Sequence, residues 1–240
     1  MQFGISCITT MPCFEPKHYY SPLPNLQSGV EKYNIANAGN FPVVVFNNNN
    51  SLLFVGSSTG TLRMIDNRSG QALAAETNTH ATGIISLTLS PDGRLLASGG
   101  GDGVVKTWNV SDLTPVDGYQ AHQSAVRSLA FSPDGSQIIS IGDKSVKSCN
   151  WQNNSCNEIA NSEDDVGSLA VASNGHIAFS EVSFLIRQEN PIFLQDLRSG
   201  QKLGSLLGHS DRVTALAYTP NSRFLISGSS DKTIIIWEVQ

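Results

Sequence analysis

The sequence predicts an all-β protein. Short segments of alternating or β-branched residues recur along the chain, and clusters of Gly, Pro, Asn, Asp and Ser separate them about every 8 to 12 residues. No stretch shows the period of an amphipathic helix of useful length. The 21 glycines and ten prolines suit a turn-rich β fold, and a hydrophobic content of 40% is ample for a packed core.

The last stretch of the chain shows the pattern most clearly. It begins at Gly208-His209 and predicts strands at residues 213–218, 224–227 and 233–237. Turns separate them at residues 219–222 and 229–232. The second strand ends in Ser227, and Trp237 follows Asp231 by six residues.

The same frame recurs upstream at a spacing of about 42 residues, which indicates a repeat architecture. One copy holds His80, Ser98, Asp102 and Trp108. The next holds His122, Ser140 and Asp143, with Cys149 where Trp is expected. His80 and His122 are 42 residues apart, and the interval from Trp108 to Trp237 is 129 residues, or three periods of 43. One further repeat must therefore lie between the third copy and the last.

Two weaker copies complete the series. Strands are expected at residues 43–46, 52–55 and 61–65, and again at 166–171 and 192–195. Ile65 and Gln195 occupy the Trp position in these copies. Near-identical turns follow at residues 66–71 and 196–201, which makes a chance similarity a poor explanation.

These residues and spacings resemble the WD-repeat family over about residues 30–240. The resemblance implies a β-propeller of four-stranded blades around a channel. We expect five blades, with residues 30–35 pairing with residues 233–238 to close the ring and cover two sheet edges. An incomplete ring, finished by a partner or by self-association, is the alternative. Residues 1–29 do not fit the repeat, and four prolines predict an irregular extension.

The resemblance further implies a structural hydrogen-bond network within the blades. Trp supplies an N–H donor, Ser and His can donate and accept, and Asp accepts. The network of the third blade should be truncated at Cys149, where Trp151 is a candidate to compensate; the first and fourth blades should depend on apolar packing. The implied residues are His80, Ser98, Asp102, Trp108, His122, Ser140, Asp143, His209, Ser227, Asp231 and Trp237.

Function is predicted to be non-catalytic: an interaction scaffold or adaptor that binds protein or peptide partners through loops at the blade ends. Lys144, Arg212 and Lys232 give this rim some positive character, which favours an acidic or peptide-like partner. The alternatives are a substrate-recognition subunit of a ubiquitin ligase, a propeller fragment completed by a partner, and, less favoured, a hydrolase. The partner-binding candidates are Thr82, Gln123, Ser124, Arg127, Lys144, Asp211, Arg212, Thr214 and Lys232.

Other motifs are better explained structurally. Residues 56–60 match G-x-S-x-G, but a strand and not a helix is expected to follow them. The Asp-x-Arg segments at Asp66 and Asp196 resemble a tail that some WD-repeat ligase receptors use, but the preceding Trp is absent. Cys7, Cys13 and His18 match no common zinc finger spacing. No catalytic residue, metal or cofactor is therefore expected.

Composition and charge limit the possible partners and the cellular location of the protein. A net charge of −5 and a pI near 5.5 argue against general nucleic-acid binding, which favours a basic domain. No apolar run is long enough to span a membrane, and the first residues lack a secretory leader. Four cysteines without a CxxC pair suit a reducing compartment. The expected location is the cytoplasm, with the nucleus possible.

Overall fold

The computed structural model describes residues 43–162, 164–182 and 190–239, and all of its strands lie in one compact unit, Ile35–Gln240. The extension at residues 1–29 and the expected closing strand at residues 30–35 fall outside the described residues. Closure of the ring and the boundary at residue 30 therefore stay predictions.

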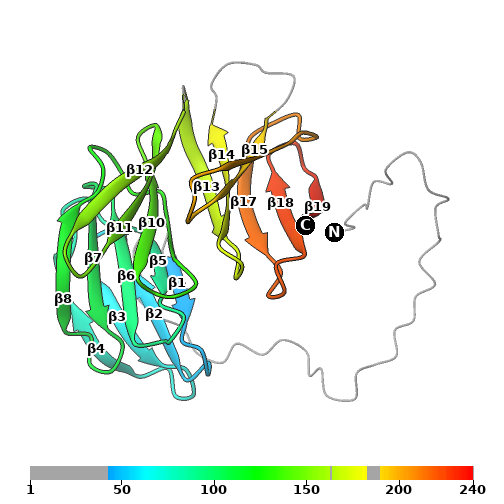
Figure 1. Cartoon of the computed structure of the whole chain (residues 1–240). Coiled ribbons are helices and arrows are strands. Elements are labelled where there is room, and N and C mark those ends of the chain that lie inside the picture. Colours follow the sequence, from blue (N-terminus) through cyan, green and yellow to red (C-terminus); the bar gives the residue numbers. More distant parts are fainter. Residues whose placement is uncertain (1–42, 163, 183–189, 240) are drawn as a thin grey trace, which may run out of the picture. The chain divides into compact units, whose positions relative to one another are not determined.

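The described chain is all-β, as expected, and folds into five antiparallel sheets, which we call blades 1 to 5 (Figure 1). Blades 1 to 4 have four strands in sequence order, and the described part of blade 5 has three. Blade 1 comprises β1 (Val43–Phe46), β2 (Leu52–Gly56), β3 (Leu62–Asp66) and β4 (Ala72–Glu76). Blade 2 comprises β5 (Ile84–Leu89), β6 (Leu95–Gly100), β7 (Val104–Asn109) and β8 (Pro115–Gln120). Blade 3 comprises β9 (Ser128–Phe131), β10 (Gln137–Gly142), β11 (Ser145–Asn150) and β12 (Ser155–Asn161). Blade 4 comprises β13 (Asp165–Val171), β14 (His176–Val182), β15 (Ile192–Asp196) and β16 (Lys202–Leu206). Blade 5 comprises β17 (Val213–Tyr218), β18 (Phe224–Ser229) and β19 (Ile234–Glu238).

The turn between the first two strands of blade 2 shows why this sequence folds locally as it does. Ser90 donates its hydroxyl to Asp92 at 2.6 Å, and the same hydroxyl accepts the backbone N–H of Leu95 at 2.9 Å. Gly93 then adopts φ +71°, a left-handed conformation that favours glycine. The Ser-Pro-Asp-Gly turn of blade 3 repeats this geometry, so the turn chemistry sets the hairpin register twice.

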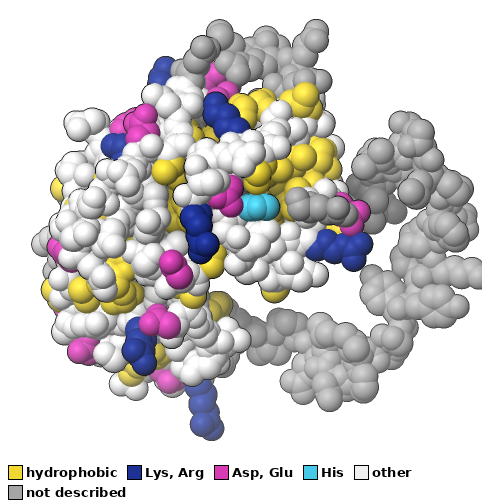
Figure 2. Space-filling model, in the orientation of Figure 1, with side chains coloured by type: hydrophobic (Ala, Val, Ile, Leu, Met, Phe, Trp, Pro, Cys, Tyr) yellow, Lys and Arg dark blue, Asp and Glu magenta, His cyan; other side chains and the backbone are white. Residues whose placement is uncertain are grey.

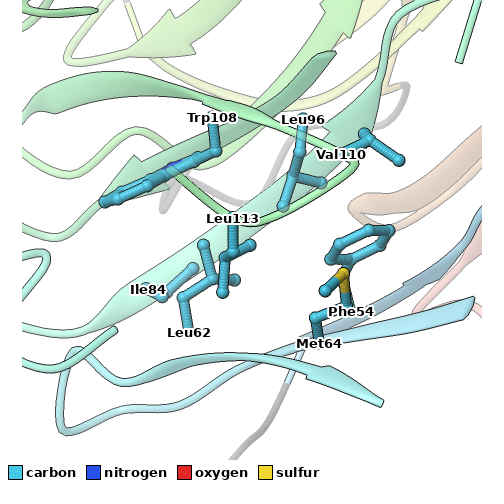
Figure 3. Close-up of a cluster of buried hydrophobic side chains, with 8 residues drawn as sticks. All are labelled: Phe54, Leu62, Met64, Ile84, Leu96, Trp108, Val110 and Leu113. Carbon is cyan, nitrogen blue, oxygen red and sulfur yellow. The ribbon is translucent and has the colours of Figure 1, made fainter. Parts of the chain in front are cut away.

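Consecutive blades pack through their sheet faces, with the first strand of each blade against the first strand of the next. We call the face that meets the next blade in the chain the forward face, and the opposite face, which carries the Trp position, the rear face. At the first junction Phe54, Leu62 and Met64 on the forward face of blade 1 meet Leu96 and Trp108 on the rear face of blade 2 (Figure 3).

The other three junctions repeat this arrangement with different residues. The forward residues of blades 2, 3 and 4 are fully buried, and the rear face of the next blade contributes aliphatic side chains to each junction. The pairs are Ala97 and Val105 against Leu129 and Ile138, Ile139 and Val146 against Leu169 and Ile177, and Ala178 and Ile192 against Val213 and Leu225. Because each fully buried aliphatic side chain contributes about 1.5–3 kcal/mol, these junctions hold the array together.

Backbone hydrogen bonds at one end of the blades reinforce the junctions. Gly103, in the turn after β6, accepts the N–H groups of Ala121 and His122 at 3.0 and 3.1 Å, which ties blade 2 to the loop that begins blade 3. The carbonyl of Gly60 likewise accepts the N–H of Thr79 at 2.8 Å. Both glycines have φ +77°, and a Cβ on either would collide with the backbone of the following loop. These turns therefore require glycine.

Candidate functional site

The His, Ser, Asp and Trp side chains of blade 2 form one connected chain of hydrogen bonds. His80 precedes β5, Ser98 lies in β6, Asp102 follows β6 and Trp108 lies in β7. The imidazole Nδ1 is 3.1 Å from the Asp102 carboxylate and Nε2 is 2.8 Å from the Ser98 hydroxyl, which also accepts the Trp108 indole N–H at 2.9 Å. Asp102 additionally accepts the backbone N–H of Ala81 at 2.8 Å.

Protonation states consistent with this chain follow from burial. Burial lowers the pKa of His80 against the opposing effect of Asp102, so the imidazole is neutral near pH 7. Burial raises the pKa of Asp102, but hydrogen bonds from Ala81, Val104 and His80 outweigh it, and the net pKa is lowered. The charged carboxylate assigns the proton to Nδ1, which leaves Nε2 to accept from Ser98. Each member of the chain then has a compatible partner, which rigidifies the blade.

Blade 5 repeats the chain. His209 lies 2.9 Å from Asp231 and 2.7 Å from Ser227, whose hydroxyl accepts the Trp237 indole N–H at 2.8 Å. Thr233 adds a hydrogen bond of 2.6 Å to Asp231. Burial acts to raise the pKa of Asp231, but the hydrogen bonds from Thr233 and His209 outweigh burial. The net pKa is lowered, so the carboxylate stays charged.

Blade 3 holds only part of the chain. His122 Nε2 is 2.9 Å from Ser140, but Nδ1 is 3.7 Å from Asp143 and has no hydrogen-bond partner. The truncation at Cys149 agrees with the sequence, whereas the loss of the Asp143 contact was not predicted. Compensation by Trp151 was wrong, because its indole N–H donates to the carbonyl of Gly135 at 3.0 Å. Burial, with a smaller effect of Lys147, lowers the pKa of His122 to about 4.

Cys149 has a second role that the sequence did not reveal. It faces Cys156 directly across β11 and β12, and the two form a disulfide. Disulfides are rare in reducing compartments, so the cysteine count no longer argues for one. The cytoplasmic location stays a prediction.

Blade 4 has a polar network of its own, which corrects the expectation of apolar packing alone. The hydroxyls of Ser168 and Ser180 are 2.8 Å apart, both side chains are buried, and Ser180 also donates to the carbonyl of Val213 in blade 5 at 3.2 Å. Gln195, at the Trp position, donates to the carbonyl of Ile159 in blade 3 at 2.8 Å. The spacing of these residues differs from the repeat pattern, so no motif signalled them.

The nine partner-binding candidates are all exposed and lie at the end of the blades that carries the His and Asp positions. Gln123 and Ser124 contribute their backbone N–H and hydroxyl groups, respectively, to the Asp143 turn. Asp211 accepts the backbone N–H of Arg212 at 2.7 Å, and Thr214 donates to the carbonyl of Gly228 at 3.3 Å. The buried chains of hydrogen bonds thus position loops whose outer side chains face solvent: Thr82, Gln123, Ser124, Arg127, Lys144, Asp211, Arg212, Thr214 and Lys232.

Arg127 differs from the other basic candidates. Its guanidinium is 2.8 Å from the Asp165 carboxylate, so it links the residue just before β9 of blade 3 to the start of β13 in blade 4. Much of its charge is neutralised by this pair. The side chains of Arg212 and Lys232 form no ion pair among the described residues, and they are the stronger candidates for contact with an acidic group.

The remaining motifs occupy turns. The segment at residues 56–60 leads into β3, not a helix, and Ser57 hydrogen-bonds Thr59 at 2.8 Å. Asp66 and Asp196 each accept the N–H and hydroxyl of the serine three residues on, which closes the hairpins β3–β4 and β15–β16. Cys7, Cys13 and His18 lie outside the described residues. Within the described ranges no cluster of three or more His, Cys, Asp or Glu forms a metal site, and no helix is long and apolar enough to cross a membrane.

Five sheets with a repeated His, Ser, Asp and Trp frame define the class of β-propeller repeat proteins. Residues 72–109, 113–150 and 200–238 match the family "WD domain, G-beta repeat". The chain therefore contains three repeats of the WD family.

Its relatives include proteins of plants and yeast. The chain is 28% identical to "Protein FIZZY-RELATED 1" of Arabidopsis thaliana over 193 residues, which cover 79% of this chain and 40% of the relative. It is equally similar to "B-type cell cycle switch protein ccs52A" of Medicago truncatula, with the same coverage. Identity to "WD repeat-containing protein srw1" of Schizosaccharomyces pombe is 28% over 67% of this chain and 29% of the relative. The chain thus spans two fifths or less of these relatives' length.

Proposed function

We propose that the chain is a non-catalytic interaction scaffold that binds an acidic or peptide-like protein partner at the loops next to the His and Asp positions. One observation carries this proposal. Exposed polar and basic side chains on several blades sit directly above buried, hydrogen-bonded side chains that hold their loops in place. A rigid base with exposed loops is the arrangement that recognition sites favour.

Charge supports the choice of partner. Arg212 and Lys232 lie in neighbouring loops of blade 5, where the N–H of Ser230 donates to the carbonyl of Arg212 at 2.9 Å. The backbone contact holds the two loops together, so two cations without an ion pair among the described residues lie on neighbouring loops. A carboxylate-rich segment would neutralise both. Two relatives from Medicago truncatula, ccs52A and ccs52B, are named as cell cycle switch proteins, so regulatory proteins are the first partners to try.

The test is capture of partners by the intact chain and by the variant Arg212→Glu plus Lys232→Glu. We expect the variant to lose the partner, at least tenfold in affinity, and to keep the melting temperature of the parent chain. The matched control is Arg94→Glu plus Lys202→Glu, which reverses two exposed cations away from these loops and should leave capture unchanged.

Full capture by the Arg212 and Lys232 variant would refute the proposed surface. The search would then move to the opposite end of the blades. There a depression of about 410 Å³ lies between the turns of blades 3 and 4, lined among others by Pro133, Asp134, Asn174 and Arg198.

A further inference from the structure

Blade 3 carries a disulfide at the position where blades 2 and 5 carry Trp. Cys149 on β11 is 0% exposed and is bonded to Cys156, which faces it directly on the outer strand β12. Ile138 is the β10 partner of Cys149 and packs against blade 2, so the disulfide lies on the rear face of blade 3. The bond therefore ties the outer strand to the buried part of its own blade.

The first half of β12 has few other contacts among the described residues besides its backbone ladder. Residues 155–158 are all exposed, whereas Ile159 and Ala160 are partly buried and pack into the junction with blade 4. Figure 2 shows mostly polar side chains and backbone atoms over β12. The turn before the strand is joined to blade 2 by a hydrogen bond of 3.2 Å from the Asn154 amide to the Asp117 carboxylate. Segments with few buried apolar contacts open most easily, so the disulfide is the main constraint on this one.

The two cysteines differ in access to solvent. Cys156 is exposed and Cys149 is fully buried, so a thiolate from solution attacks the Sγ of Cys156. The S–S bond breaks, and Cys149 leaves as a thiolate that takes up a proton, because an apolar site disfavours the charged form.

A dithiol reductant completes the exchange. Its second thiol attacks the reductant's own sulfur in the mixed disulfide and releases Cys156 as a thiol. The protein disulfide gains two electrons and two protons, and the dithiol is oxidised to a disulfide. The products are two protein thiols on neighbouring strands with no covalent link between them.

We propose that the disulfide of Cys149 and Cys156 is a redox switch for the order of residues 152–158. When the bond is formed, it closes a short loop and holds this segment against β11. Reduction by a dithiol frees the segment and breaks the contact of Asn154 with blade 2. Ile159 and the residues after it stay packed at the junction with blade 4, so the change is confined to the turn and the first half of β12. The segment is thus ordered where thiols are oxidised and free where they are kept reduced.

Hydrogen exchange of the intact chain, oxidised and then reduced with a dithiol, tests this proposal. Cys7→Ser and Cys13→Ser remove the other two cysteines from every sample. After reduction the amides of residues 155–158 should exchange at least about tenfold faster, and those of β10 and of the outer strand β16 should change less than about twofold.

Two variants separate the disulfide from its surroundings. Cys156→Ser should exchange like the reduced parent, with or without the dithiol, because it cannot form the bond. Asn157→Ser is the matched control: it changes the neighbouring exposed residue, keeps both cysteines and should respond to the dithiol like the parent.

Alkylation followed by mass spectrometry counts the thiols in the same samples. No thiol should react in the oxidised chain, and two should react after reduction, Cys156 before Cys149. Free thiols in the oxidised chain, or a disulfide that the dithiol does not reduce, would overturn the proposal. So would equal exchange of residues 155–158 in both redox states, faster exchange throughout all five blades, or loss of the response in Asn157→Ser.

Discussion

Replacing Trp108 separates the packing energy of the blade from its hydrogen-bond energy. Trp108 is 4% exposed and fills the first junction, where it contacts Leu96 and neighbours from both blades. Trp108→Ala empties a large buried aromatic site, which costs about 3–5 kcal/mol. Trp108→Phe keeps an aromatic body and removes the N–H donor. Because Ser98 still donates to His80, the hydrogen-bond part of that change should be about 1 kcal/mol.

The assay is thermal unfolding followed by circular dichroism at neutral pH. For a unit of about 200 residues, 1 kcal/mol shifts the melting temperature by about 2–4 °C. We therefore expect a fall of about 10 °C for Trp108→Ala and of a few degrees for Trp108→Phe. Trp237→Ala should cost less than Trp108→Ala, because Trp237 is only half-buried at the exposed end of the array. A melting temperature within 2 °C of the parent for Trp108→Ala, on the scale of about 2–4 °C per kcal/mol, would refute the assigned packing.

Three further predictions concern pH, redox state and turn geometry. The pKa of His122 is lowered to about 4 in the folded chain against an ordinary value of 6.5, so its contribution to stability is full above about pH 6.5 and is lost as the pH falls towards 4. Between pH 7 and pH 5 this group should lower the free energy of unfolding by about 2 kcal/mol, and the melting temperature with it. His122→Asn should flatten that dependence, and an equal slope in the variant would contradict the assignment. Cys156→Ser should lower stability by about 2 kcal/mol, because it opens the loop closed by the disulfide, and a reductant should lower the melting temperature of the parent but not of the variant. Gly103→Ala should lower the soluble yield and cost more than 2 kcal/mol, roughly, because φ is positive and the Cβ would strike the carbonyl of His122; Gly118→Ala is the control, and equal melting temperatures for the two would contradict the argument.

Strand positions could be predicted from local patterns because turn residues and alternation act over a few residues. The strands at 43–46 and 213–218 have the expected bounds, and the third strand of blade 4 starts at Ile192 as expected. The hydrogen-bonded chains of blades 2 and 5 are where the repeat frame placed them, since a fixed spacing of His, Ser, Asp and Trp puts each side chain on the same sheet position.

Contacts between repeats were harder to predict, because they depend on register across two blades. Arg127 and Asp165 are 38 residues apart in sequence, and no local pattern links them. The contact of Gln195 with Ile159 likewise depends on how blade 4 packs on blade 3. The disulfide was closer to prediction, since Cys149 and Cys156 are only seven residues apart and lie on neighbouring strands β11 and β12. Cross-strand register would have paired them.

Polar reinforcement is unevenly distributed along the array: complete in blades 2 and 5, interrupted in blade 3 and of another kind in blade 4. In repeat proteins each unit contacts only its neighbours, so local stability follows local sequence. Amide protons of blade 3 should then exchange with solvent sooner than those of blade 2, through openings that leave the rest of the chain folded. Such an opening would break the hydrogen bonds of Asp143 with Gln123 and Ser124. A partner that binds at this turn would then order the segment as it binds.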